Sequence, residues 1–437
     1  MRVGVIGTGH VGLVTCVALA EIGHDVVGVD RDQERILKLQ DGRAPFFEPG
    51  LEPLLEKGLN QRLLAFSVEP ESAVADREVV FICVGTPPRT DGQANLVAIE
   101  SAAREVARAA SGELIVAEKS TVPAGTADRI HRTIALEHRS SRNGIEVVSN
   151  PEFLREGTAI EDALRPSRIL VGANSPRGHE VMRRLYAAAI DAGSPLVETD
   201  IRTAELAKHA SNAFLALKIS YVNALARVCE RTGADVDSIA DVMGFDPRIG
   251  RAFLDAGLGY GGFCFPKDLQ AFERLADSVN YDFPLLREIR RLNDQAVEAV
   301  FDNVEDGLWN LEGKRVALLG LSFKPGTDDV RLSPSLALAR RLIDAGATVA
   351  AFDPEAMMAA KEELPELELA SDVFGAANDA HCVVLCTSWP QFRNIDLDLL
   401  KEVMAYPMVV DGRNMYDPAE MGARGFTYYP TGKPPIR

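Results

Sequence analysis

The chain has 437 residues, of which 46% are hydrophobic and 25% charged, and its formal net charge is −17. This length allows two or three domains with separate cores. The acidic balance argues against a nucleic-acid partner. No apolar run approaches the ~18 residues that a membrane helix requires, which argues against a membrane protein. Because residues 1–7 enter a predicted strand at once, we expect no signal peptide and a cytoplasmic location.

The N-terminal segment has the pattern of a dinucleotide-binding unit. Residues 3–6 read as a buried strand, residues 7–12 as Gly-Thr-Gly-His-Val-Gly, residues 13–22 as an apolar helix, and residues 25–30 as a second strand ending in Asp30. The GxGxxG glycines allow a tight turn and close approach of a pyrophosphate to the helix N-terminus. Asp30 would bond the ribose hydroxyls, which favours NAD over NADP.

Three further predicted strands lead into polar loops. Residues 79–85 lead to Thr86, and residues 114–116 lead to the Ser-Thr-Val-Pro segment 120–123. In an open parallel sheet, ligands bind beyond the carboxyl ends of the strands, so we expect these hydroxyls to face the cofactor. The strand 146–150 runs into segment 151–157, where Glu152 and Glu156 flank an arginine. This pattern fits an ion-paired helix start or a site at the strand end.

Residues of roughly 200–300 are predicted to be helical, with one long helix over 199–231 and others over 235–243 and 284–300. Lys208 and Asn212, four residues apart, project from one face of the long helix. The glycine-rich segment 257–268 is expected to interrupt this region as a loop with Pro266 fixing its exit. The loop carries Cys264, followed by a cation that could favour thiolate and a carboxylate that could relay a proton.

The six cysteines form no CxxC pair, so we expect no disulfide framework. Five lie in apolar strand-like or helical runs, where core packing is the simplest explanation: Cys16, Cys83, Cys229, Cys382 and Cys386. Only Cys264 lies outside such a run. It is either a buried structural cysteine in a connector or a nucleophile.

A second α/β pattern follows. Strand and glycine turn recur over 315–326, a helix over 335–345, a strand ending in Asp over 348–353, and an apolar strand over 383–388. Lacking GxGxxG, this copy need not bind NAD, but Lys324, Arg331 and Arg413 could take a second phosphorylated ligand. The sequence therefore predicts an α/β protein with two Rossmann-like, doubly wound parallel-sheet domains joined by a helical middle region with a long central helix. The expected domains are 1–198, 199–300 and 301–437.

The ordered motifs resemble the UDP-glucose/GDP-mannose dehydrogenase family over essentially the whole chain. They are residues 7–12, 84–87, 120–123, 150–157, Lys208 with Asn212, 261–268 and 320–329. Segments 165–169 and 411–413 look more like the enzymes that use UDP-glucose than those that use GDP-mannose. One departure is Phe263, where many members carry a small residue.

The resemblance implies four-electron oxidation of UDP-glucose to UDP-glucuronate, with two NAD per turnover, no metal, and a thioester on the cysteine that water hydrolyses. GDP-mannose or another nucleotide sugar is the alternative substrate. The product would serve polysaccharide biosynthesis. The implied catalytic residues are Cys264, Lys208, Asn212, Asp268, Thr121, Glu152 and Glu156.

The resemblance also assigns two sets of binding residues. Those for NAD are Gly7, Gly9, Val11, Gly12, Asp30, Arg35, Thr86, Thr121, Glu156, Lys267 and Arg331. Those for the UDP-sugar are Glu152, Phe153, Leu154, Arg155, Lys208, Arg248, Phe253, Leu254, Asp255, Ala256, Gly257, Gly261, Lys324 and Arg413.

A homodimer through the long central helix is implied as well, with Arg248 reaching the neighbouring subunit's substrate site. Two hypotheses of other kinds stay open. One is a two-electron dehydrogenase of the same architecture in which Cys264 is structural, and the other is an inactive NAD-binding scaffold.

Overall fold

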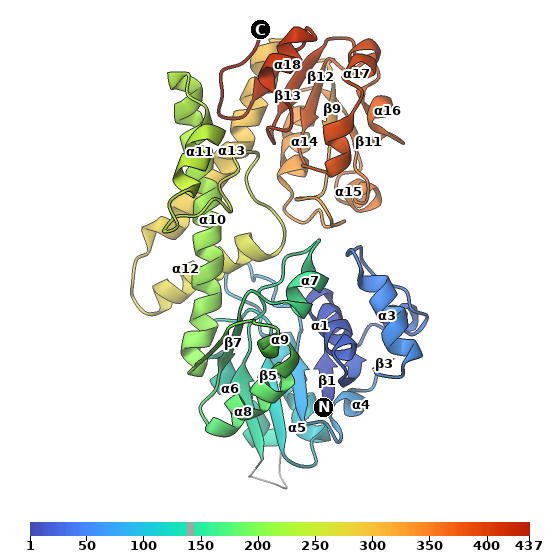
Figure 1. The fold of residues 1–437 in the computed structure, drawn as a ribbon, viewed down its shortest axis with the longest axis vertical. Helices are drawn as coiled ribbons and strands as arrows, with labels where there is room; N and C mark the ends of the chain where they lie inside the picture. The colour runs from blue at the N-terminus through green and yellow to red at the C-terminus, as the bar shows by residue number, and fades with distance from the viewer. Residues whose placement is uncertain (138–143) are drawn as a thin grey trace. The chain divides into compact units, whose positions relative to one another are not determined.

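A computed structural model describes residues 1–137 and 144–437, which form two compact units (Figure 1). Unit 1 comprises Met1–Ser211 and Gln270–Tyr281, and unit 2 comprises Asn212–Leu269 and Asp282–Arg437. The chain crosses this boundary three times, and the crossings at 211/212 and 269/270 fall inside helices. The expected division at 198 and 300 stays a prediction.

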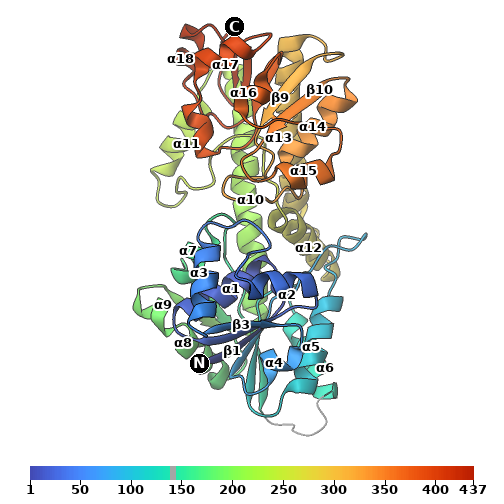
Figure 2. The same ribbon diagram turned by 90° about the vertical axis from the view of Figure 1, so that its right-hand side faces the viewer.

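Unit 1 is built on an eight-stranded sheet in the order β3-β2-β1-β4-β5-β6-β7-β8 (Figure 2). The strand order reverses beside β1, so the ends of β1 and β4 form the crevice in which such folds bind ligands. All neighbours are parallel except β6 and β7. The strands are β1 Arg2–Ile6, β2 Asp25–Val29, β3 Leu64–Ser67, β4 Val79–Ile82, β5 Leu114–Glu118, β6 Ile145–Ser149, β7 Ile169–Gly172 and β8 Leu196–Thr199.

Helices cover both faces of this sheet, because the central strands are apolar on both sides. One core lies under α1 His10–Glu21, α2 Gln33–Gln40, α3 Leu51–Asn60, α7 Ala159–Leu164, α8 Pro176–Leu185 and α9 Ala187–Asp191. The other lies under α4 Pro70–Val74, α5 Val97–Ala109 and α6 Thr126–Glu137.

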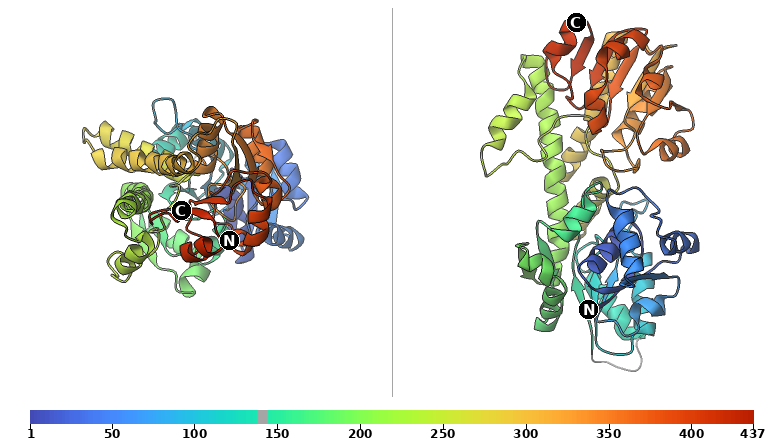
Figure 3. Two further views of the ribbon diagram at one scale, coloured as in Figure 1. Left: turned by 90° about the horizontal axis from the view of Figure 1, so that it is seen from above. Right: turned by 45° about the vertical axis from the view of Figure 1, so that its right-hand side comes forward.

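Unit 2 contains a six-stranded, fully parallel sheet in the order β11-β10-β9-β12-β13-β14, drawn in orange and red in Figure 3. Its strands are β9 Arg315–Leu319, β10 Thr348–Phe352, β11 Glu368–Leu369, β12 Cys382–Leu385, β13 Met408–Asp411 and β14 Thr427–Pro430. One core packs under α13 Pro284–Leu308, α14 Pro334–Asp344 and α15 Met357–Glu363. The opposite core packs under α16 Val373–Ala377, α17 Leu397–Val403 and α18 Pro418–Ala423, with a 3₁₀ turn at Pro390–Asn394. The predicted fold class is confirmed.

The middle of the chain contains α10 Ile201–Thr232, α11 Val236–Gly244 and α12 Cys264–Ser278. The long helix is therefore confirmed. The predicted loop over 257–268 is wrong at its end, since Cys264 already begins α12. Pro266 is tolerated there because the first amides of a helix have no intrahelical acceptor. Within the described residues, no helix is both long and apolar enough to cross a membrane.

Candidate active site

The glycines of the fingerprint have different physical roles. A Cβ on Gly12 would lie 1.9 Å from the Gly7 carbonyl oxygen, and one on Gly7, at φ +95°, would lie 2.6 Å from the Cys83 carbonyl oxygen. These two positions therefore require glycine for the turn to close. Gly9, which precedes α1, has nothing within 4 Å of its Cβ position. Its backbone is thus open to a ligand at the helix N-terminus.

Asp30 follows β2 and is hydrogen-bonded to the glycine turn. Its Oδ2 accepts hydrogen bonds from the Thr8 amide at 2.8 Å, the Thr8 hydroxyl at 3.1 Å and Arg35 Nη1 at 3.0 Å. Among the described residues, its Oδ1 accepts only the Asp32 amide, at 3.2 Å. Burial raises the pKa of Asp30, but these hydrogen bonds and the Arg35 charge outweigh burial and lower it. The carboxylate is therefore ionised, and Oδ1 has capacity for a further donor.

These residues line one groove of about 630 Å³ within unit 1. Gly7, Gly9, Asp30, Arg35 and Gly85 are among its walls. The groove has the size of a nucleotide site. Val11 and Thr86 lie outside its lining, but the Thr86 hydroxyl donates to the Thr121 carbonyl at 3.0 Å and so ties the two polar loops together.

The segment after β6 presents a buried ion pair. Glu152 Oε1 lies 2.9 Å from Lys208 Nζ, and the two side chains are 6% and 5% exposed. The other Glu152 oxygen accepts the Leu154 amide at 2.5 Å. Arg155 instead pairs with Asp162 at 2.7 Å, so the hypothesis of a helix start paired with Glu152 and Glu156 is wrong. The segment is held by contacts with α7 and α10.

Cys264 is half-buried and is the first residue of α12, so it lies at the positive end of a helix dipole. A helix N-terminus stabilises a thiolate. The same turn contains Lys267 and Asp268. Asp268, 1% exposed, accepts Lys267 Nζ at 2.5 Å on Oδ1 and Asn212 Nδ2 at 2.6 Å on Oδ2. The carboxylate thereby fixes the Asn212 amide.

The remaining cysteines are buried, as predicted. Burial raises the pKa of every one of these thiols, to about 12 for Cys83 and Cys386. Because a thiolate is the reactive species, these groups are inert.

A second cluster of predicted residues lies within unit 2. A Cβ on Gly257 would lie 2.5 Å from the Gly412 carbonyl oxygen and 3.0 Å from Arg413 Nη1. Arg413 Nε donates to the Cys386 carbonyl at 2.7 Å, and burial lowers the pKa of this guanidinium. Leu254 and Ala256 belong to the small core of α10 and α11, which anchors the approach to Gly257.

The glycines before Cys264 permit a close backbone contact. A Cβ on Gly261 would lie 2.4 Å from the Leu332 carbonyl oxygen, and the Gly262 amide donates to the Arg331 carbonyl at 2.9 Å. The ring of Phe263 contacts Arg331 at 4.6 Å and Lys267 Nζ at 5.3 Å. The unusual phenylalanine therefore stacks with two of the predicted cofactor-binding cations.

Four further predicted substrate residues make other contacts. Arg248 is 87% exposed and pairs with Asp246, while Asp255 is 84% exposed and pairs with Arg251. Phe253, at φ +66°, contacts the ring of Phe265. The Lys324 ammonium lies 5.6 Å from the ring of its neighbour Phe323.

The second sheet carries a counterpart of Asp30 whose carboxylate accepts hydrogen bonds from groups of the protein itself. Asp353 follows β10 and accepts the Leu321 and Ser322 amides at 2.7 and 3.1 Å. Trp389 Nε1 also donates to it, at 3.1 Å. The other oxygen, Oδ1, accepts the Glu355 and Ala356 amides at 2.9 Å each, so both oxygens of Asp353 are used within the protein, which gives a physical reason why this copy needs no NAD.

Sequence reasoning missed Glu48, which links the fingerprint to the segment after β6. Its Oε2 accepts the Gly157 amide at 2.7 Å and lies 3.1 Å from His10 Nε2, while Oε1 accepts the Ala159 amide at 2.8 Å. Glu48 lies in an irregular stretch with no periodicity, so its burial left no signal in the sequence.

Over residues 1–137 and 144–437, no group of three or more His, Cys, Asp and Glu side chains could hold a metal ion.

Comparison with known proteins gives a consistent result over the whole chain. The UDP-glucose/GDP-mannose dehydrogenase family matches with its NAD binding domain at residues 1–190, its central domain at 202–295 and its UDP binding domain at 317–418. A UDP-glucose 6-dehydrogenase of Rhizobium meliloti is 44% identical, covering 99% of this chain and 100% of its own. One of Bacillus subtilis is 42% identical, covering 99% and 98%. A UDP-glucose dehydrogenase structure from Pyrobaculum islandicum is 38% identical, with a TM-score of 0.91 over 99% and 98%.

Proposed function

The chain belongs to the UDP-glucose/GDP-mannose dehydrogenase family, and we propose that it oxidises UDP-glucose to UDP-glucuronate with two NAD per turnover. The observation that carries the four-electron reaction is Cys264 at the N-terminus of α12, in one helical turn with Lys267 and Asp268. A two-electron dehydrogenase has no use for an activated thiol.

The glycine turn and Asp30 would bind NAD, which accepts a hydride when bound. Asp30 Oδ1 would take the ribose hydroxyls, and the open backbone at Gly9 would take the pyrophosphate. Arg35 holds the carboxylate in place. Val11, Thr86, Thr121, Glu156, Lys267 and Arg331 would complete the cofactor site.

The thiol divides the oxidation into two steps. The C6 alcohol first loses a hydride and a proton to become an aldehyde. The Cys264 sulfur then adds to the aldehyde carbon, and the thiohemiacetal loses a second hydride and a proton to give a thioester. Water cleaves the carbon–sulfur bond, which releases the carboxylate and returns the thiol.

Charged and polar groups on α10 and α12 would serve these steps. Lys208 and Asn212 would stabilise the alkoxide oxygens, a role typically worth about 3 kcal/mol of barrier. Asp268, with Thr121, would manage the proton transfers. Glu152 and Glu156 would orient the hydrolytic water. A hydrogen bond and an ion pair support this division, because Asp268 orients Asn212 and Glu152 orients Lys208.

Arg413, Lys324, Gly257 and Gly261 would hold the UDP-sugar, together with residues 253–256 and 152–155. Support comes from the contact of Gly257 with Arg413 and from the match of the UDP binding domain at 317–418. GDP-mannose is the alternative substrate, since the family name covers both. UDP-glucose is favoured because the similar full-length proteins carry that name.

We further propose a cytoplasmic homodimer that assembles through α10, with the three-part division of the chain at about 198 and 300. Three apolar side chains along α10 are exposed and support an interface, namely Phe214, Tyr221 and Val228. Arg248, which is exposed and pairs with the nearby Asp246, would reach the partner's substrate.

The deciding experiment measures NADH formed per sugar consumed with limiting UDP-glucose, and with GDP-mannose in parallel. Two NADH per UDP-glucose are expected. One NADH would leave the thiol without a role, and turnover of GDP-mannose alone would change the substrate while keeping the mechanism.

Cys264→Ser tests the thiol directly. It should abolish two-NADH turnover, while Cys229→Ala, a matched change of a buried thiol with a raised pKa, should preserve it. Full activity of Cys264→Ser would contradict the covalent step.

A further inference from the structure

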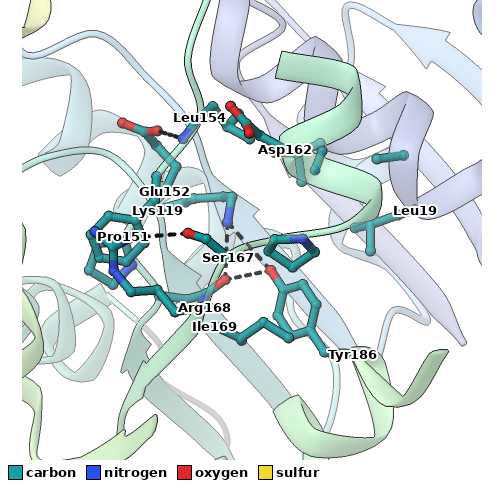
Figure 4. A pocket seen from close by; sticks show the side chains of 16 residues that line it. Leu19, Lys119, Pro151, Glu152, Leu154, Asp162, Ser167, Arg168, Ile169 and Tyr186 are labelled. Carbon is teal, nitrogen blue, oxygen red and sulfur yellow. Dashed lines mark hydrogen bonds between the residues drawn. The ribbon is translucent and has the colours of Figure 1, made fainter. Parts of the chain in front are cut away.

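A small, partly open cavity in unit 1 lies outside the groove assigned to the cofactor. It is bounded by α1, the segment after β6, residues 166–169 and Tyr186, and has about 60 Å³ of space for water-sized atoms (Figure 4). A single water needs about 10–15 Å³ by the same measure, so the cavity holds roughly four to six water-sized atoms.

One wall of the cavity is a buried lysine with no acidic partner. Lys119 is only 8% exposed, and its Nζ donates to Asn150 Oδ1 at 3.2 Å and to the Tyr186 hydroxyl at 3.4 Å. The Tyr186 hydroxyl in turn donates to Asn150 Oδ1 at 2.6 Å. Among the described residues Lys119 makes no ion pair. A buried ammonium whose hydrogen bonds go to neutral groups lacks the close ion pair that usually compensates such a charge.

A second cation lines the same space. Arg168 stacks on the ring of Phe153 at 3.7 Å, and its Nη1 donates to the Ser167 hydroxyl at 3.1 Å. Nowhere in residues 1–137 and 144–437 does Arg168 find a carboxylate within ion-pair distance. In Figure 4 the side chains of Lys119 and Ser167 converge on one space, with Arg168 bonded to Ser167. Two cations and a hydroxyl thus meet at one cavity.

The two acids that line the cavity form their ion pairs with other cations, although the charge of Glu152 also acts on Arg168. Glu152 and Asp162 also line the cavity, but Glu152 pairs with Lys208 and Asp162 with Arg155. Glu118 precedes Lys119 in the chain, and burial followed by the charge of Glu205 raises the pKa of this carboxyl well above its ordinary value. Burial thus disfavours the charged form of Glu118, and neither Lys119 nor Arg168 has an ion pair among the described residues.

We propose that this cavity binds a small oxyanion, of the size of inorganic phosphate or sulfate, between Lys119, Ser167 and Arg168. Charge-assisted bonds from an ammonium and a guanidinium are the strongest that proteins offer to such an anion. A phosphate has five non-hydrogen atoms, which matches the space. The anion would hold residues 150–154 against the strand end at Lys119, and so would stabilise the segment that carries Glu152.

The test uses the full chain and inorganic phosphate, with sodium chloride keeping the ionic strength constant. The unfolding temperature is measured against phosphate concentration for the unchanged protein, Arg168→Gln, Lys119→Met and Arg43→Gln. Arg43, 66% exposed and paired with Asp41, is the matched loss of an exposed positive charge. Phosphate that binds at the nucleotide sites would raise the unfolding temperature of all four proteins equally.

Arg168→Gln and Lys119→Met should each raise the phosphate concentration for half-maximal stabilisation by about tenfold or more, while Arg43→Gln leaves it unchanged. If Lys119→Met does not fold, Ser167→Ala replaces it as the milder change. Equal responses of all variants would overturn the proposal, as would no response of the unchanged protein, which would mean that the cavity holds water. Glycerol 3-phosphate, too large for the cavity, should show no difference between the variants, and a difference would overturn the assignment to a free oxyanion.

Discussion

Replacing Asp30 by alanine should weaken the use of NAD without changing the chemistry at C6. Oδ2 is committed to Thr8 and Arg35, so the ribose would bond to Oδ1, which accepts only the Asp32 amide. A hydrogen bond to a charged group contributes about 1.5–3 kcal/mol. Losing one should therefore raise KM for NAD about 10- to 150-fold. The ratio of kcat/KM for NAD to that for NADP should fall, since a 2′-phosphate no longer meets a carboxylate.

The assay is the initial rate over a range of NAD, then of NADP, at saturating UDP-glucose. Asp32→Asn is the control, because Asp32 caps α2 and asparagine also caps helices well. The KM of Asp32→Asn for NAD should stay within about twofold of that of the unchanged protein, because an exposed substitution usually changes free energies by less than about 0.5 kcal/mol.

Measurements of thermal stability distinguish the role of Asp30 in the fold from its role in binding NAD. Its lowered pKa means that the carboxylate stabilises the fold at pH values above its unfolded pKa, about 3.9. This contribution disappears as the pH falls through the lower, folded pKa. Asp30→Ala should therefore lower the Tm at pH 7 more than at pH 3. An unchanged KM for NAD in a folded Asp30→Ala protein would refute the assignment of Asp30 to the ribose.

Three further predictions concern buried groups. Glu118→Gln should raise Tm at pH 8 by about 2–6 °C. The raised pKa of Glu118 makes the folded state lose stability as the pH rises from about 4.5, and Glu118 Oε1 has no hydrogen-bond partner among the described residues. If the variant's Tm changed with pH as steeply as that of the unchanged protein, this reasoning would be wrong. Lys208→Met should cost about 3–5 kcal/mol by urea unfolding and lower kcat about 100-fold or more, and adding Glu152→Gln should restore stability but not kcat. Gly12→Ala should lower Tm sharply, whereas Gly9→Ala should keep Tm and raise only KM for NAD; similar effects of the two on Tm would contradict the distinction.

Much of the fold was predictable because it rests on local patterns. The apolar runs at 3–6 and 79–85, the GxGxxG turn and the repeat of the same plan after residue 313 each follow from periodicity and glycine chemistry. The burial of the five cysteines other than Cys264 also follows from the runs in which they lie. The end of the glycine-rich segment was mistaken because Pro266 reads as a helix breaker, although the first turn of a helix needs no amide at that position.

The residues that a sequence reading cannot assign are those whose role depends on a partner far along the chain. Glu48 and Gly157 are 109 residues apart, and Arg155 turned out to pair with Asp162 rather than with its adjacent glutamate. No periodicity records such pairs. The same holds for Lys119 and Arg168, which look like ordinary charged residues in the sequence.

The sequence by itself determined the two Rossmann-like sheets, the long central helix, the dinucleotide turn and the candidate residues, because backbone geometry and apolar periodicity are properties of short segments. Only the tertiary structure decided that Cys264 begins a helix, that Asp30 keeps one oxygen available while both oxygens of its counterpart Asp353 are used, and that Lys119 and Arg168 share a cavity. Burial and charge compensation decide these features, and both depend on which distant segments pack together.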